Sequence, residues 1–199
     1  KKHFLIMSND SFKINYIEHS VKFVKKNIKA FIVLLIIALI FLFGFLLLEN
    51  LQKKNNIQIA ENYSQALLMI KQKKIKKSKI LLEGIIDKDH QFYSPLSLYL
   101  IIDNNIEKEK SKIITYFDKI IKNNSIDVED INLIKIKKAI YLINLDNEEL
   151  IIETLNPVIN SNSVWRNLAI NLISEYFFSK DQKIKAEEYI RLLNNKTRN

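Results

Sequence analysis

The 199-residue sequence contains no cysteine, only two glycines and two prolines, and a single tryptophan. Without cysteine, the chain forms neither disulfide bonds nor thiolate metal sites. Such low glycine and proline contents leave almost no turn signals for a β-sheet protein, and two glycines cannot build a phosphate-binding loop. Hydrophobic residues make up 48% of the chain and recur with helical spacing. We therefore expect an all-α protein.

Residues typical of catalytic sites are also scarce. The three histidines, His3, His19 and His90, are isolated from one another. An Asp–His group can bind a metal, and His90 does lie beside Asp87 and Asp89, but a plain loop is the simpler interpretation. Acidic pairs such as Glu148-Glu149 fit solvated helix faces better than acid–base pairs. We expect no enzyme, cofactor or metal site.

The formal net charge of +9 raises the possibility of a nucleic-acid partner. However, the chain is rich in Ile, Lys and Asn, which are encoded by AT-rich codons, so genome bias accounts for much of the lysine. A domain outside the cytoplasm would also meet no genome. We expect no nucleic-acid partner and attribute the charge to solubility or to a membrane surface.

One uncharged run covers Ala30–Leu48 and reads AFIVLLIIALIFLFGFLLL. As an α-helix these 19 residues extend about 28 Å, close to the roughly 30 Å hydrocarbon core of a bilayer. A buried helix of a large soluble core is the alternative, but such a helix usually keeps a polar face. The run therefore predicts a transmembrane helix that holds the chain in the lipid bilayer.

The residues that flank this run predict its orientation. After the run, residues 49–68 contain Lys53 and Lys54 together with Glu49 and Glu61. Lysine excess marks the cytoplasmic side, which predicts a cytosolic basic tail over residues 1–29 and an exported domain over residues 49–199. A cleaved signal peptide has an apolar region of only about 7–15 residues and a small-x-small site, so we expect an uncleaved signal-anchor. The lysines before the run that flank the membrane are Lys22, Lys25, Lys26 and Lys29.

After the span, apolar residues recur at spacings of three and four in eight segments separated by short polar joints. Pro95 suits a first helical turn, whereas Pro157 should kink or end its helix near Asn156. Leu51–Gln58 lacks proline and glycine, so we expect the span helix to continue past the membrane. The eight segments predict four antiparallel helical hairpins: Ala60–Ile70, Ser78–Ile85, Pro95–Ile102, Glu107–Ile121, Val128–Leu145, Glu148–Ile159, Trp165–Phe178 and Gln182–Leu193.

Small residues recur in these hairpins. In the second helices they are Ser78, Ser111 and Ala186, and Ala66 lies twelve residues before Ser78. A repeat of about 34 residues, with small residues where helices cross closely, is typical of tetratricopeptide-like hairpins. We therefore expect a tetratricopeptide-like α-solenoid of about four degenerate hairpins. Later first helices carry Tyr99 and Ser174 where Ala66 stands in the first.

The order of these segments resembles a known family. The stretch from Met7 reads MSNDSF, an anchor follows, and residues 60–70 read A-x-x-Y-x-x-A-L-x-x-I. Further on come Pro157, Val164-Trp165-Arg166-Asn167, Lys180-Asp181 and Ala186-Glu187. These features are similar to the YfgM-like proteins, whose tetratricopeptide-like domain is shared by the ancillary SecYEG translocon subunit under a label that also covers the cell-division coordinator CpoB. The sequence departs from the family at Ser163-Val164, in place of Asn-Pro, and at Lys180, in place of a turn glycine.

The resemblance implies a bitopic bacterial inner-membrane protein with a periplasmic repeat domain. It implies no catalysis, and its implied partners are the SecYEG translocon, periplasmic chaperones and exported polypeptides. We therefore predict a membrane-anchored protein-binding module in which the first helix of each hairpin lines the binding surface. A self-associating scaffold for the envelope or for cell division is the alternative. The candidate protein-binding residues are Asn62, Gln65, Met69, Tyr99, Lys135 and Arg166.

Two further features have two interpretations each. Six lysines within residues 71–79 form a solvated turn or a contact for lipid headgroups or acidic partners. Trp165 packs between the third and fourth hairpins, with Ala169 and Leu172, or serves as a binding residue.

Overall fold

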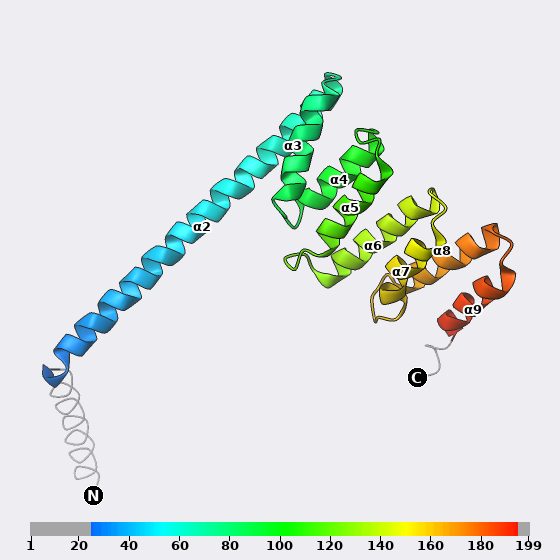
Figure 1. Cartoon of the computed structure of the whole chain (residues 1–199). Helices are drawn as coiled ribbons and strands as arrows, with labels where there is room; N and C mark the ends of the chain where they lie inside the picture. The colour runs from blue at the N-terminus through cyan, green and yellow to red at the C-terminus, as the bar shows by residue number, and fades with distance from the viewer. Residues whose placement is uncertain (1–24, 195–199) are drawn as a thin grey trace, which may run out of the picture. The chain divides into compact units, whose positions relative to one another are not determined.

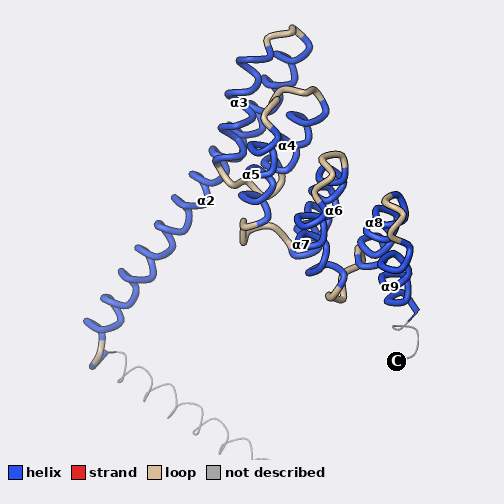
Figure 2. The backbone as a smooth tube through the Cα atoms, turned by 45° about the vertical axis from the view of Figure 1, so that its right-hand side comes forward, coloured by secondary structure: helices blue, strands red, loops and turns tan. Residues whose placement is uncertain are grey.

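The computed structural model describes residues 25–194, and every regular element among them is an α-helix (Figures 1 and 2). This confirms the all-α expectation for that part of the chain. The predictions for residues 1–24 of the basic tail, which include Lys22 and the first two histidines, lie outside the described residues. The helices are α2 (Ile28–Lys71), α3 (Ile75–Asp87), α4 (Tyr93–Asp103), α5 (Lys110–Ile121), α6 (Val128–Ile143), α7 (Glu148–Ile159), α8 (Arg166–Ser179) and α9 (Lys183–Asn194).

Helix α2 has 44 residues and contains the apolar run. It is long and apolar enough to cross a membrane, and none of its most apolar stretch is buried in the protein. Phe41 and Phe43, for example, are 76% and 64% exposed. Such a continuous apolar surface is unfavourable in water and favourable in lipid. The helix continues from this run to Lys71, which confirms the predicted extension beyond the span.

The chain divides into two compact units between Ile57 and Gln58. The second unit consists of four antiparallel hairpins, formed by the end of α2 with α3, α4 with α5, α6 with α7, and α8 with α9. Successive helices from α3 to α9 contact one another, and α6 also contacts α8. The turns within the hairpins lie along one edge of the unit, the turn edge. The loops between hairpins lie along the opposite edge, the loop edge (Figures 1 and 2).

The four turns within the hairpins share one hydrogen-bond pattern. Each contains a residue with positive φ, namely Lys73, Asn105, Asp146 or Asp181. The N–H of this residue bonds the carbonyl three residues earlier, and the next N–H bonds the carbonyl five residues before itself. This is the Schellman arrangement, which satisfies carbonyls at a helix C-terminus. The left-handed residue of the fourth turn is Asp181, and not Lys180, which stands where the YfgM-like pattern has a turn glycine.

Aligning the four turns brings out the structural repeat. The residues seven positions before the left-handed residue are all buried: Ala66, Leu98, Ala139 and Ser174. Ala66 and Ser78 are both fully buried, as the small-residue pattern predicts. The expectation for Ser111 is wrong, because this residue is exposed and its hydroxyl donates to Glu109.

The longer turn of the second hairpin explains this difference. Helix α5 begins five residues after Asn105, whereas α3, α7 and α9 each begin two residues after their left-handed residue. Counting by a fixed period therefore misplaces α5. Buried Glu107 holds the extra segment, since its Oε1 accepts the N–H of Lys108 at 2.7 Å and of Glu109 at 2.9 Å. Its Oε2 lies 2.7 Å from Nζ of Lys79 on α3.

The hydrophobic core of this unit has two parts that meet at α6. The first includes Ala66, Leu98 and Phe117 and reaches Ile134 in the first half of α6. The second runs from Ile136 through α7 and α8 to Ala186. Trp165 packs against the second part beside buried Ala169 and half-buried Leu172, as predicted.

Pro157 does not end its helix where expected. Helix α7 continues through Pro157 to Ile159. Because the proline lies in the last turn, its missing N–H removes a single helical hydrogen bond. Three residues later, the N–H of Asn160 still donates to the carbonyl of Asn156 at 3.0 Å.

Candidate functional site

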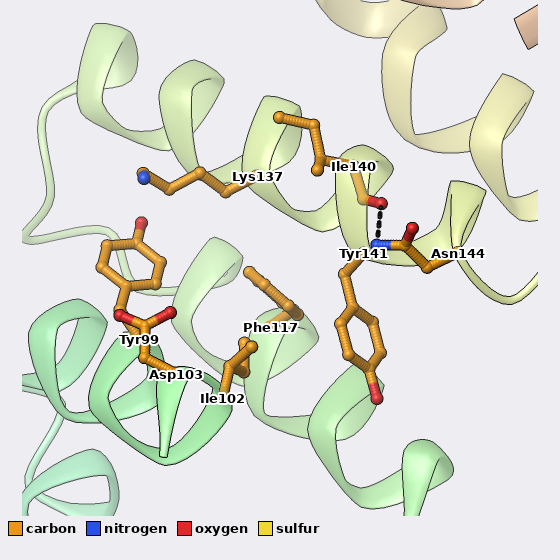
Figure 3. A pocket seen from close by; sticks show the side chains of 8 residues that line it. All are labelled: Tyr99, Ile102, Asp103, Phe117, Lys137, Ile140, Tyr141 and Asn144. Atoms are coloured by element: carbon orange, nitrogen blue, oxygen red, sulfur yellow. Dashed lines mark hydrogen bonds between the residues drawn. The ribbon is translucent and has the colours of Figure 1, made fainter. Parts of the chain in front are cut away.

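A groove opens where α4 and α6 flank α5 (Figure 3). Its volume is about 230 Å³. It lies on two first helices of hairpins, the helices that the sequence predicts to form the binding surface. Its lining residues are Tyr99, Ile102, Asp103, Phe117, Lys137, Ile140, Tyr141 and Asn144.

The centre of the groove is apolar and aromatic. Phe117 of α5 is only 1% exposed and belongs to the first part of the core. Its ring centroid lies 6.1 Å from that of Tyr141, within the range of aromatic pairs. Ile102 of α4 and Ile140 of α6 lie on either side, and Ile140 is 48% exposed. This arrangement places a packed aromatic floor beneath an accessible aliphatic rim.

Polar groups lie at both ends of the groove. Nζ of Lys137 is 4.6 Å from the ring centroid of Tyr99, a cation–π distance. Burial, followed by the Asp130 carboxylate, raises the pKa of Tyr99 to about 12. The phenol therefore stays protonated at neutral pH and can donate a hydrogen bond. At the other end, Asn144 donates to the carbonyl of Ile140 at 3.2 Å.

This combination suits recognition of a peptide. An apolar side chain of a ligand can occupy the floor at Phe117, while the Lys137 cation and the Tyr99 hydroxyl can contact its carbonyl or carboxylate oxygens. Asp103 adds an exposed carboxylate at the end of α4. Within residues 25–194, no group of three or more His, Cys, Asp or Glu side chains could hold a metal ion.

Of the six predicted binding residues, the groove contains one, Tyr99. Lys135 lies on the same helix as Lys137 but points elsewhere, because two residues correspond to about 200° around an α-helix. It is half-buried, and burial lowers the pKa of its ammonium group. Helical spacing within α6 could have identified Lys137 together with Tyr141, which lies four residues further along the helix.

The other four predicted residues lie outside the groove. Asn62, Gln65 and Met69 are on the final part of α2, where Gln65 is exposed and the other two are half-buried. Arg166 is held within the fold. Its Nε donates to the carbonyl of Ile159 at 2.9 Å, and Nη2 donates to that of Leu192 at 2.9 Å. The side chain thereby satisfies carbonyls near the ends of α7 and α9.

Two groups considered for chemistry have structural partners. Nδ1 of His90 accepts the N–H groups of Phe92 and Tyr93, at 3.1 and 3.2 Å, where α4 begins. Glu148 accepts hydrogen bonds from Lys185 at 2.9 Å and from Gln182 at 3.2 Å. The bond to Lys185, followed by that to Gln182, lowers the pKa of Glu148. This carboxylate therefore joins the third and fourth hairpins, which differs from the solvated role that we expected.

The geometry of residues 25–194 thus comprises one candidate membrane span and a domain of helical hairpins that carries a surface groove. No family model, no curated protein and no solved structure matches this chain.

Proposed function

We propose that this protein is a membrane-anchored protein-binding module. The groove between α4 and α6 carries the proposal, because it combines a buried aromatic floor with accessible polar groups. Protein-binding hot spots have this composition, with aromatic residues and cations around a well-packed centre. No catalytic step is part of the proposal.

We further propose that the hairpins form a tetratricopeptide-like solenoid. The shared turn geometry supports a repeat, and so do polar contacts between consecutive hairpins at nearly constant sequence separation. In two of these contacts, Asn123 donates to the carbonyl of Asp89, and Ser163 donates to Glu129, both at 2.6 Å and over 34 residues. The other contacts join Lys119 to Asp87, Lys180 to Asp146 and Gln182 to Glu148.

The proposed location is a bacterial inner membrane, with the N-terminus cytoplasmic and the hairpins periplasmic. Exposed Lys25, Lys26 and Lys29 precede the apolar run, and lysine excess favours the cytoplasmic side. The resemblance to the YfgM-like proteins suggests the partners, which are the SecYEG translocon, periplasmic chaperones and exported polypeptides.

Site-specific photo-crosslinking in cells tests the proposed function. A crosslinker at Ile140 on the groove rim should give adducts with translocon subunits, chaperones or exported chains, identified by mass spectrometry. A crosslinker at exposed Glu153 of α7 is the matched control and should give few such adducts. Lys137→Glu should reduce the Ile140 adducts, whereas Lys110→Glu, at another exposed lysine, should not. Adducts only to a second copy of the chain would contradict the proposal in favour of the scaffold alternative.

A further inference from the structure

Five lysines lie close together at the turn between α2 and α3. We call them the lysine patch: Lys71, Lys73, Lys74, Lys76 and Lys77. All five side chains are exposed. None of them makes an ion pair with a carboxylate among the described residues, and Lys74 donates only to the amide oxygen of Gln72 at 2.8 Å. Lys79, the next lysine along, differs because it pairs with Glu107 at 2.7 Å.

Several lysines near the other turns have acidic partners. Lys180 lies 2.6 Å from Asp146, Lys183 lies 3.4 Å from Asp181, and Lys112 lies 3.5 Å from Glu107. At the second turn, exposed Lys108 and Lys110 also make no ion pair among the described residues, but Glu107 and Glu109 alternate with them in the sequence. Residues 71–79 contain no acidic residue, so the lysine patch has no such neighbouring negative charge. Like charges three or four residues apart repel one another, so the patch lowers the stability of its own turn.

The backbone of this turn is a second and independent exception. Lys73 has a φ of 60°, while the equivalent positions of the other turns hold Asn105, Asp146 and Asp181. Asparagine and aspartate tolerate the left-handed conformation, whereas a lysine there is strained by its Cβ atom. The first turn thus has both an unfavourable residue at its left-handed position and unpaired positive charge. Departures of this kind from the usual sequence preferences are expected at functional surfaces.

We propose that the lysine patch docks an acidic segment of a partner protein. The positions of neighbouring charges favour a polypeptide over a lipid surface. The four turns lie along one edge, and the other turns expose carboxylates, including Asp103, Glu109 and Asp181 (Figure 1). A flat anionic membrane laid on this edge meets those carboxylates as well, whereas an acidic peptide can contact the first turn alone.

Fluorescence anisotropy with a labelled poly-L-glutamate peptide tests this docking, using the full chain in phosphatidylcholine nanodiscs. Changing all five patch lysines to glutamine should weaken binding at least about tenfold near 0.15 M salt, since concentrated charge governs the contact. The matched control changes five other exposed lysines, and it should bind within about twofold of the wild type. These control positions are Lys53, Lys54, Lys108, Lys110 and Lys122.

The two variants carry the same net charge, so equal weakening would overturn the proposal by showing that net charge alone governs binding. Binding of phosphatidylglycerol vesicles should not depend on the patch. If the patch variant selectively lost vesicle binding, the patch would bind a lipid surface, and the proposal of a polypeptide partner would be overturned.

A second variant, Lys76→Glu with Lys77→Glu, places acids in the first turn of α3, where the helix dipole favours them. It should fold with wild-type helicity and lose peptide binding, and retained binding would contradict the proposal.

Discussion

At the scale of single residues, several charged side chains hold the backbone rather than a ligand. Arg166 bonds two carbonyls near helix ends, and Glu107 bonds two N–H groups of its turn. The Lys138 ammonium group, on a side chain only 9% exposed, lies 2.6 Å from Asp118 and ties α6 to α5. The contacts of Glu107 and Lys138 hold α5, which carries Phe117 of the groove, against its neighbours.

Replacing Phe117 with alanine should lower the free energy of unfolding by about 3–5 kcal/mol, because the ring fills the core beneath the groove. Chemical denaturation followed by circular dichroism measures this change. Phe92→Ala is the control, since Phe92 is 59% exposed and its loss should cost about 1 kcal/mol at most. A cost below about 1 kcal/mol for Phe117 would contradict its place in the core.

Acid should weaken the fold partly through Glu107. The N–H of Glu109, followed by the Lys79 ammonium group, lowers the pKa of Glu107 from 4.5 to about 2. A carboxyl whose pKa is lowered by folding stabilises the fold above its unfolded pKa, and this stabilisation disappears as the pH falls toward the folded value. Glu107→Gln should therefore be less stable than the wild type at pH 7, measured by urea unfolding.

The stability difference for Glu107→Gln should shrink below about pH 4.5 and nearly vanish near pH 2. Exposed Glu153→Gln serves as the control and should show little difference at any pH. A difference for Glu107→Gln that stays constant from pH 7 to pH 2 would show that the carboxylate does not make these contacts.

At the scale of helices and turns, the Schellman turns set the register of the hairpins. Glycine at Lys73 should stabilise the protein by about 0.5–1 kcal/mol, because glycine adopts positive φ without strain. Lys76→Gly, inside α3, should instead destabilise it by a similar amount, about 0.5–1 kcal/mol. Thermal unfolding of both variants measures the shifts. Destabilisation by Lys73→Gly would mean that this turn does not hold the left-handed conformation.

Much at this scale could be predicted from the sequence. The uncharged run identified the apolar part of α2, and helical periodicity identified the end of α2 and the helices α3 to α9, because Ile, Leu and Phe of the core recur at spacings of three and four. The second hairpin was misaligned, since the additional residues before α5 are held by side-chain contacts of Glu107 that carry no periodic signal. The groove could be predicted only in part. It arises from the separation of α4 and α6 across α5, and Lys137, Ile140 and Tyr141 come together through tertiary packing.

At the scale of the whole molecule, the chain joins an apolar helix to a separate compact unit of helical hairpins. Residues 55–199, released from the anchor, should form a soluble and mostly helical domain, because both parts of its core lie after residue 58. Circular dichroism checks the helix content, and cooperative urea unfolding checks the packing. An unfolded chain or appreciable strand content would contradict this division of the molecule.

The central claim is that the anchor holds a binding domain at the membrane. A short tether raises the local concentration of the domain to the order of millimolar, enough to make a weak contact productive. The side chains of the span itself are not required for binding in this account. Replacing Ala30–Leu48 with an unrelated span should therefore preserve association with the partner, whereas the released domain should lose most of it.

Co-purification of partners with the wild-type, span-exchanged and released forms tests this claim most directly. The account predicts that the first two forms recover the same partners at similar yield, and that the released domain recovers little despite wild-type helicity. Loss of the partners on span exchange alone, with the hairpins still folded, would contradict it.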